Sequence, residues 1–376
     1  MIHQYKNNGY NIVMDVCSGA IHVVDDVTYD VIALYEEKSL EEIENELSYS
    51  KEDIEEAYKE VTSLKEEGLL FTEDIYEDYI KEVKSRKTVV KALCLHIAHD
   101  CNLACRYCFA EEGEYKGHRE LMSAKVGKAA LDFLVANSGN RHNLEVDFFG
   151  GEPTMNFGVV KEVVEYGRSL EEKHNKHFRF TLTTNGVLLN DEIMEFANKE
   201  MDNVVLSVDG RKEIHDYMRP TRNGKPSYDL IMPKFIRFAE SRHQQKYYVR
   251  GTFTNRNLDF SKDVLHLADL GFEQISMEPV VGHPEEPYAI QEKDLPQIFD
   301  EYDRLAKEMI KREKVGKGFN FFHFMIDLTG GPCVAKRLSG CGSGTEYLAV
   351  TPWGDLYPCH QFVGEEKFLL GNVFDG

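Results

Sequence analysis

Residues 89–108 read VVKALCLHIAHDCNLACRYC, and this stretch decides the fold prediction. Its first part, Val89 to Ile97, is apolar and predicts a buried β-strand. Three cysteines follow as Cys101, Cys105 and Cys108, in the spacing C-x3-C-x2-C. Three thiolates this close suit three irons of a 4Fe–4S cluster, which leaves the fourth iron open to a ligand that is not protein. A structural zinc site is the alternative, but zinc usually takes paired C-x2-C knuckles and four protein ligands.

Six strand-like segments alternate with helical segments between residue 89 and about residue 312. Alternation of this kind predicts parallel strands joined by right-handed crossovers. An eight-stranded barrel would need two more units. We therefore expect an α/β fold class, a partial (β/α)6 TIM-type barrel, with its active site at the C-terminal strand ends. The expected strands are 89–97, 144–149, 178–183, 204–208, 247–254 and 274–280, and the expected helices are 123–137, 155–176, 190–200, 226–243, 261–270 and 293–312.

Three turns at the ends of these strands are rich in glycine and small polar residues. Gly150-Gly151-Glu152-Pro153 follows the second strand, Thr183-Thr184-Asn185-Gly186 the third, and Ser207-Val208-Asp209-Gly210 the fourth. Two glycines let the backbone approach a ligand closely, and Glu152 offers an acceptor for an ammonium group. Each turn alone is compatible with an ordinary strand-to-helix connection. Together, at one end of the sheet, the turns predict a cofactor pocket.

Residues 1–71 predict a small separate domain with a winged-helix-like outline. A hairpin of strands 10–16 and 21–24 precedes three helical stretches, and 69–71 reads as a further short strand. The usual role of this shape is DNA binding, but the segment after the hairpin is strongly acidic, and phosphate contacts require Lys and Arg. We therefore expect peptide binding, with a purely structural cap as the alternative, and a charged linker at 72–88.

The composition limits the possible partners and location of the chain. Its 376 residues carry a formal net charge of −21, which argues against a nucleic-acid partner. No apolar run reaches the ~18 residues of a membrane span, and the N-terminus lacks a signal-peptide pattern, so we expect a cytoplasmic protein without membrane contact. Six of the eight cysteines fall at 101–108 and 333–359, a grouping typical of metal ligands rather than disulfides in that compartment.

The cysteine loop and the Gly-Gly-Glu-Pro turn together resemble the radical S-adenosylmethionine (radical SAM) superfamily over roughly residues 89–312. The loop has the family's spacing, with an aromatic residue before the last cysteine, and the turn matches the family's GGEP motif. The resemblance implies a 4Fe–4S cluster whose open iron is chelated by S-adenosyl-L-methionine (SAM). It also implies cleavage of SAM to a 5′-deoxyadenosyl radical, which removes hydrogen from an unactivated C–H bond.

The same resemblance assigns roles to individual residues. Ser207 matches a position that commonly contacts the ribose. Arg219 is expected to bind the ribose or the carboxylate, with a solvated surface arginine as the alternative. Met277, at the sixth strand end, is expected to line the adenine side, although the family's glycine-rich adenine motif is not evident there. The remaining assignments are Cys101, Cys105 and Cys108 to the cluster, and Tyr107, Gly150, Gly151 and Glu152 to SAM.

Beyond about residue 313 the sequence becomes glycine-rich and irregular, and strands at 347–350 and 356–357 read as a hairpin. Cys341 and Cys359 bracket a glycine in the pattern C-x12-G-x4-C, which resembles the opening of a SPASM domain, the auxiliary-cluster module of peptide-modifying radical SAM enzymes. With Cys333, the resemblance implies one auxiliary 4Fe–4S cluster. The module's other cysteines are missing, so we expect a truncated, partial SPASM region at 313–376, or an auxiliary iron open to a substrate thiolate. Zinc or free thiols are the alternatives.

The N-terminal domain gains a role from this context, because its hairpin and three helices are similar to PqqD-like leader-peptide recognition domains. The whole combination looks closest to the maturases of six-cysteine (SCIFF) peptides. It implies thioether crosslinking of a Cys-rich precursor peptide with a leader, and an electron donor such as ferredoxin or flavodoxin. The alternatives are formylglycine formation as in sulfatase maturation, carbon–carbon crosslinking, and a non-catalytic zinc-dependent peptide-binding module.

Overall fold

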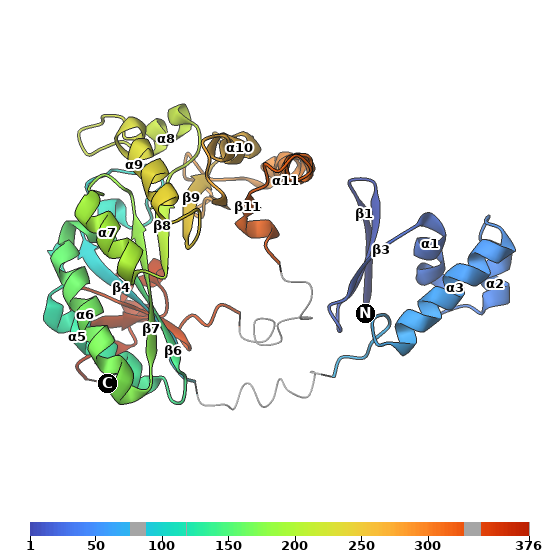
Figure 1. Cartoon of the computed structure of the whole chain (residues 1–376), viewed down its shortest axis with the longest axis horizontal. Helices are drawn as coiled ribbons and strands as arrows, with labels where there is room; N and C mark the ends of the chain where they lie inside the picture. Colours follow the sequence, from blue (N-terminus) through green and yellow to red (C-terminus); the bar gives the residue numbers. More distant parts are fainter. Residues whose placement is uncertain (76–87, 118, 327–339, 376) are drawn as a thin grey trace. The chain divides into compact units, whose positions relative to one another are not determined.

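The computed structural model describes residues 1–75, 88–117, 119–326 and 340–375, and the chain divides into two compact units (Figure 1). The first unit comprises Met1–Lys87 with Ile326–Cys341, and the second comprises Thr88–Met325 with Gly342–Gly376. Among the described residues, no helix combines the length and the apolar character of a membrane span.

The first unit combines a three-stranded antiparallel sheet with three helices. The sheet order is β1-β2-β3, so β2 lies in the middle. Side chains cap all three helices at their N-termini, two of them through the pairs Ser39 with Glu42 and Ser50 with Asp53 and the other through Asp25. The elements are β1 (Ile2–Asn7), β2 (Tyr10–Asp15), β3 (Ile21–Val24), α1 (Asp26–Leu34), α2 (Leu40–Glu46) and α3 (Lys51–Glu66).

Two features of this unit differ from the sequence prediction. The hairpin of β2 and β3 forms, but β1 joins it as a third strand that the prediction lacked. Residues 69–71 form no strand. Instead, Leu70 is fully buried in the core of the unit, and Phe71 adopts a left-handed backbone conformation with φ of 53°. The backbone N–H of Thr72 then donates to the buried carboxylate of Asp15, which fixes the chain after α3 to the end of β2.

The second unit is built on an 11-stranded sheet that contains the six predicted parallel strands as consecutive neighbours. The path from β4 to β10 is parallel at every step, and within the described residues the sheet does not close into a barrel. The sequence prediction of an open, partial barrel therefore agrees with the sheet. The six strands are β4 (Ala92–His99), β6 (Asn143–Gly150), β7 (His177–Thr184), β8 (Asn203–Ser207), β9 (Tyr247–Phe253) and β10 (Gln274–Pro279).

Helices between the strands cover the outer face of this sheet (Figure 1). Strand residues alternate between this face and an inner face. On β6, Val146 and Phe148 are fully buried in the main core. The alternate residues Asp147 and Phe149 point to the inner face and are only partly buried. The helices are α5 (Ala124–Asn137), α6 (Phe157–His174), α7 (Asp191–Glu200), α8 (Lys212–Met218), α9 (Tyr228–Ser241), α10 (Ser261–Asp269) and α11 (Leu295–Glu313).

Short strands extend the sheet beyond the predicted six. The predicted hairpin near the C-terminus forms from β12 and β13, and β12 also pairs in parallel with β4 across a long sequence separation. At the opposite end of the sheet, β11 pairs with β10. These additional strands are β5 (Glu120–Leu121), β11 (Asn320–Phe321), β12 (Tyr347–Val350), β13 (Asp355–Tyr357) and β14 (Gly371–Asn372).

Candidate functional site: a cysteine-lined cavity at the strand ends

A cavity of about 570 Å³ lies at the C-terminal ends of the parallel strands. Its wall includes the cysteine loop after β4, the turns after β6, β7 and β8, the ends of β9 and β10, and part of the short helix η5 (His360–Phe362). These segments converge because the carboxyl ends of parallel strands meet at one edge of the sheet. The sequence analysis assigned residues between 89 and 312 to the cluster or to SAM. All of them except Met277 line this cavity.

The two glycines of the GGEP turn allow a backbone-to-backbone contact. Gly150 has φ of 115°, and a Cβ there would lie 2.4 Å from the carbonyl oxygen of Ala98. A Cβ on Gly151 would lie 2.1 Å from the carbonyl oxygen of Asp100. Hydrogen bonds accompany the contact, since Gly151 N–H donates to Ala98 O at 2.7 Å and Glu152 N–H donates to Asp100 O at 2.9 Å. The turn is therefore pressed against the backbone that leads into the cysteine loop.

Glu152 fastens two of the turns together. Its carboxylate is 1% exposed and accepts hydrogen bonds from Thr154 N–H at 3.0 Å, Thr184 Oγ1 at 2.8 Å and Asn185 N–H at 2.7 Å. Burial raises the pKa of this carboxyl, while the donated hydrogen bonds act in the opposite direction. The turn after β6 and the turn after β7 are thus held by one side chain. Sequence reasoning assigned Glu152 to a ligand and missed this second role.

The cysteines meet the chemical requirements of an iron–sulfur ligand set. All three line the cavity, and Cys101 Sγ lies 3.6 Å from Asn185 Nδ2. Burial raises the pKa of Cys101 to about 12 and also raises that of Cys105, so these thiols ionise only when a cation is bound among them. Within the described part of the chain, no three His, Cys, Asp or Glu side chains are arranged to share a single metal ion. An iron–sulfur cluster spreads its cysteine ligands over separate irons.

Asp209 connects the cysteine loop to the turn after β8. Its buried carboxylate accepts a hydrogen bond from Tyr107 Oη at 2.8 Å and another from Arg219 Nε at 3.0 Å. The Arg219 guanidinium also lies 5.5 Å from the centre of the Tyr107 ring. The backbone N–H of Thr252 on β9 donates to the same carboxylate at 3.0 Å. The Arg219 side chain is therefore paired and only 12% exposed, so the alternative of a solvated surface arginine is wrong.

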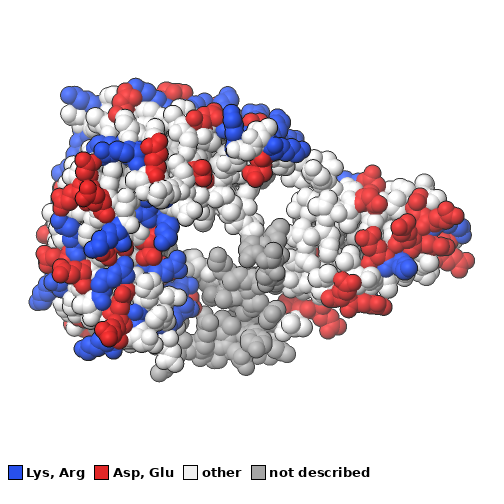
Figure 2. Space-filling model, viewed as in Figure 1, with Lys and Arg blue, Asp and Glu red and all other residues white. Residues whose placement is uncertain are grey.

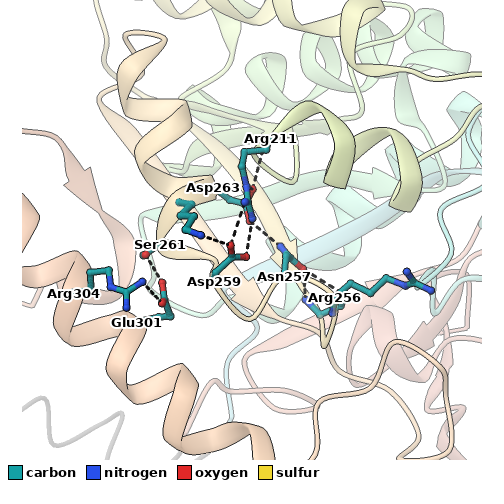
Figure 3. A network of polar contacts seen from close by, with 10 residues as sticks. Arg211, Arg256, Asn257, Asp259, Ser261, Asp263, Glu301 and Arg304 are labelled. Carbon is teal, nitrogen blue, oxygen red and sulfur yellow. Dashed lines mark hydrogen bonds and ion pairs between the residues drawn. The ribbon is translucent and has the colours of Figure 1, made fainter.

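A second polar network holds the same turn from the outside (Figure 3). Arg211 directly follows the turn, and its backbone N–H and Nε both donate to Asp263 Oδ1, at 2.9 and 2.8 Å. Its Nη2 donates to Asp259 Oδ1 at 2.8 Å. Asp263 is fully buried on α10 and also accepts from Asn257 at 3.0 Å. The turn after β8 is therefore fixed on one side to the cysteine loop and on the other to α10.

Met277 does not belong to the site. Its side chain is 0% exposed, lies in the main core and packs beside Gly251 on the neighbouring strand. Because side chains alternate along β10, the next residue, Glu278, lines the cavity instead. Sequence reasoning also missed Arg250 on β9 and Asp209. The available signal was the same in each case, a charged residue within or directly after an apolar strand.

The three C-terminal cysteines are described only in part. Cys359 is partly buried, its Sγ lies 3.5 Å from His360 Nδ1, and His360 lines the cavity. Cys341 is exposed, and Cys333 lies outside the described residues. Their assignment to one auxiliary cluster therefore stays a prediction.

Comparisons with known proteins agree with this geometry. The model of the radical SAM superfamily matches residues 95–242. An uncharacterized protein of Methanocaldococcus jannaschii is 29% identical over 76% of this chain and 90% of its own length. The cysteine-type anaerobic sulfatase-maturating enzyme of Clostridium novyi is 26% identical over 73% of this chain and 74% of its own.

Two solved structures share the fold. The structure of native anSMEcpe with bound AdoMet has a TM-score of 0.64 and 21% identity, over 76% of this chain and 78% of that one. Streptococcus suis SuiB bound to precursor peptide SuiA has a TM-score of 0.54 and 17% identity, over 100% of this chain and 85% of that one. The family match spans the cysteine loop, the GGEP turn and the turn after β8, so this part of the chain is similar to the radical SAM superfamily.

Proposed function

We propose that this chain is a radical SAM oxidoreductase that forms thioether crosslinks in a Cys-rich precursor peptide. The observation that carries the proposal is the convergence of Cys101, Cys105 and Cys108 with the GGEP turn in one cavity whose far wall has polar groups left for a substrate. The relationship to a sulfatase-maturating enzyme supports a peptide or protein substrate. The full-length fold match to SuiB, a protein solved with a precursor peptide, supports the same class.

The chain's own residues prepare the cavity for these cofactors. The three cysteines would hold the 4Fe–4S cluster, and the GGEP turn with Ser207 would bind SAM. Asp209 holds Tyr107 and Arg219 in place, so the loop and the turns are fixed before any ligand arrives. When bound, SAM and the clusters would supply the one-electron chemistry that takes a hydrogen atom from carbon and removes the surplus electron.

The overall chemical change in the peptide defines which electron and proton acceptors are required. One C–H bond and one S–H bond break, one C–S bond forms, and two protons and two electrons leave the peptide. SAM as co-reactant accounts for one hydrogen atom. An auxiliary iron–sulfur cluster at Cys333, Cys341 and Cys359 would accept the remaining electron. The proton of the cysteine thiol has to pass to a side chain of the protein.

The first unit would bind the leader of the peptide. β3 lies at one edge of its sheet, and Val23 on that strand is 65% exposed. An edge strand with free backbone groups accepts an extended peptide as an additional strand. A cytoplasmic electron donor such as ferredoxin or flavodoxin would be the second partner, because reduction of the cluster needs an external low-potential electron.

The test uses anaerobically reconstituted full-length protein with SAM, dithionite and a Cys-rich peptide that carries a leader segment. Mass spectrometry is expected to show loss of two hydrogen atoms from the peptide per crosslink. Alkylation should also label fewer cysteines afterwards, because each crosslink consumes one thiol. An unchanged peptide mass would reject thioether formation.

Formylglycine formation is a second candidate, which the relationship to the Clostridium novyi enzyme favours. The same mass spectrum separates the two. Formylglycine formation removes sulfur from the peptide and leaves an aldehyde that reacts with hydrazines, whereas a thioether keeps every sulfur atom. A sulfatase-derived cysteine peptide without a leader serves as the substrate for this arm.

A further inference from the structure

The outer side of the cysteine loop is a surface that the assignments above leave unused. Ala104 and Arg106 alternate with the cysteines along the loop, but neither lines the cavity, and Arg106 is exposed to solvent. The segment 217–222 runs antiparallel to the loop, since Arg106 N–H donates to Met218 O at 2.9 Å and Ala104 N–H donates to Pro220 O at 2.8 Å. A partner protein on this side would therefore contact the loop without entering the cavity.

Two arginines contact the ring of Tyr217 at one end of this surface. The guanidinium carbon of Arg106 lies 4.4 Å from the ring centre, and that of Arg256 lies 4.2 Å from it. Arg106 Nε also donates to the carbonyl oxygen of Tyr217 at 2.7 Å. Arg256 belongs to the loop between β9 and α10, and its side chain extends away from the network around Arg211 (Figure 3). The ring, which is 40% exposed, therefore holds two cations from separate loops in one place.

Two further cations lie at the other end of the segment. Arg222 donates to the carbonyl oxygen of Cys101 through Nε, and to Asp100 Oδ1 through Nη2 at 2.6 Å. Lys225 is exposed in the turn that follows, and with Arg222 and the half-exposed Leu230 it lines a hollow beside the loop. We call this set the basic surface, and it comprises Arg106, Tyr217, Arg222, Lys225 and Arg256.

The positive charge of the basic surface is only partly neutralised by the chain. Within the described residues, Arg222 is the one member that forms an ion pair, with Asp100. Like charges held close together repel one another, so an anionic partner would be stabilised here. The net charge of −21 does not prevent this, because carboxylates gather over α2 and α3 of the first unit (Figure 2). At physiological salt, exposed charges more than about 8 Å apart are largely screened, so the cations at the contact decide the encounter.

We propose that the basic surface docks the electron donor, an acidic redox protein such as flavodoxin or ferredoxin. Its position and its charge both support this partner. The surface lies on the outer side of the loop that would hold the cluster, and its charge is opposite to that of an acidic donor. Exposed Arg and Tyr are also the residue types that protein interfaces favour. In the complex, one electron leaves the reduced donor and enters the cluster, and no bond or proton changes. The inference rests on the proposed function, because a bound cluster is what requires the electron.

A purely structural stack of arginines on Tyr217 predicts different behaviour. Exposed contacts between a cation and a ring contribute little to stability, so charge reversal at Arg256 would leave any partner's affinity unchanged. A docking surface, in contrast, makes association depend on these charges and on salt. Electrostatic steering of this kind changes association rates by about 10- to 1,000-fold.

The experiment measures donor binding directly and does not depend on turnover. Full-length reconstituted protein titrates a fluorescently labelled, oxidised flavodoxin of strongly negative net charge in fluorescence anisotropy, at low and at high salt. In K225E/R256E the Kd should rise about tenfold at low salt, and its difference from the wild-type Kd should shrink at high salt. R141E/K246E is the matched control, because it changes the net charge equally. Arg141 and Lys246 are exposed just before β6 and β9 begin, at the opposite edge of the sheet from the cysteine loop.

Electron delivery provides the second readout. With limiting reduced flavodoxin as the reductant, K225E/R256E should form 5′-deoxyadenosine about tenfold more slowly than wild type, after each rate is divided by that with dithionite. Flavodoxin affinities and rate ratios that are equal in the two double variants would overturn the proposal. A loss of peptide affinity in K225E/R256E with unchanged flavodoxin affinity would also overturn it, since the surface would then bind the peptide. Should wild-type protein form no 5′-deoxyadenosine with dithionite, the proposed radical chemistry fails, yet the titration still decides whether the basic surface binds the donor. Circular dichroism confirms that each variant is folded.

Discussion

At the scale of single residues, the glycines of the GGEP turn were predictable and their partner was not. The sequence indicates that Gly150 and Gly151 permit a close approach. It contains no information on what approaches, and the structure shows that the carbonyl oxygens of Ala98 and Asp100 lie there. Contacts of this kind depend on the register between β4 and β6, which is set by the whole sheet.

Gly151→Ala tests this contact. The new Cβ would lie 2.1 Å from Asp100 O, so the turn or the cysteine loop has to move, and overpacking of this kind costs about 1–3 kcal/mol. Urea unfolding should show the loss, and reconstitution should yield less cluster absorbance near ~400 nm, as expected for a distorted ligand loop. Gly158→Ala on α6 is the control, because no atom lies within 4 Å of its added Cβ. Equal behaviour of both variants would contradict the contact.

Met277 and Glu278 show the limit of sequence reasoning at this scale. Both lie at the end of β10, and the sequence places that strand end at the site. The choice between them depends on which face of β10 carries the helices, and a shift of one residue exchanges the two faces. The apolar Met277 is in the core and the charged Glu278 lines the cavity. Polarity was the better guide here than position in the motif.

At the scale of elements, Asp209 shows that motif residues depend on contacts with residues from other elements. The sequence assigns Tyr107 and Arg219 separately to SAM, but both bind the carboxylate of Asp209, to which the prediction gave no role of its own. The loop after β4 and α8 are far apart in sequence, and they meet because β4 and β8 belong to the same parallel sheet. The role of Asp209 follows from this tertiary contact, which no local pattern contains.

Asp209→Asn should destabilise the second unit strongly. The change removes the negative charge from Arg219, whose side chain is 12% exposed, and breaking a buried ion pair costs about 3–5 kcal/mol. Asp229→Asn is the matched control, since Asp229 pairs with Lys212 at the surface and its loss should change stability by less than about 0.5 kcal/mol. Urea midpoints give both values. A D209N midpoint equal to that of D229N would show that the carboxylate charge is unimportant.

His215 gives the start of α9 and the turn after β8 a dependence on pH. Its Nδ1 accepts from Asp209 N–H at 3.3 Å, and its Nε2 bonds to Ser227 Oγ at 3.0 Å, so the neutral ring is needed. Burial is the main cause that lowers the pKa of His215 to about 4. Below pH ~6.5 the unfolded chain binds a proton that the folded chain does not, so stability falls between pH ~6.5 and 4 by up to about 1.4 kcal/mol per pH unit.

Denaturant unfolding of His215→Gln at several pH values checks this. The variant should be less stable at pH 8 but lose less further stability on acidification, because the titrating group is gone. His174→Gln, at an exposed position on α6, should keep the wild-type slope. If the stability of the His215→Gln variant fell on acidification as steeply as that of wild type, other groups would cause the pH dependence.

At the scale of the whole molecule, the order of elements was predictable and the ends of the sheet were not. Alternating patterns indicate the six parallel strands and an open barrel, because local periodicity and right-handed crossovers determine that arrangement. The hairpin of β12 and β13 was also predictable from its turn. Its pairing with β4 was not, since some 250 residues separate Lys91 from Glu346, which the structure joins at 2.7 Å.

The division into two units leads to a last prediction, on how the peptide is held. The cavity belongs entirely to the second unit, whereas the exposed edge strand β3 belongs to the first. If the leader binds at β3, leader binding and radical chemistry are separable. A leader segment without cysteines should therefore inhibit crosslinking competitively and leave peptide-independent formation of 5′-deoxyadenosine unchanged.

The variant Val23→Asn locates the binding. Asparagine disfavours strand conformation and removes an exposed apolar contact, so the affinity of the labelled leader should fall about tenfold, roughly 1.4 kcal/mol, in a fluorescence anisotropy titration of the full chain. Lys59→Asn, a change to the same residue at an exposed site on α3, should keep the wild-type affinity. Equal affinities in both variants would remove β3 from the binding site. A change confined to the leader site leaves the cysteine-lined cavity intact. If Val23→Asn also lost peptide-independent cleavage of SAM, the two units would not act separately.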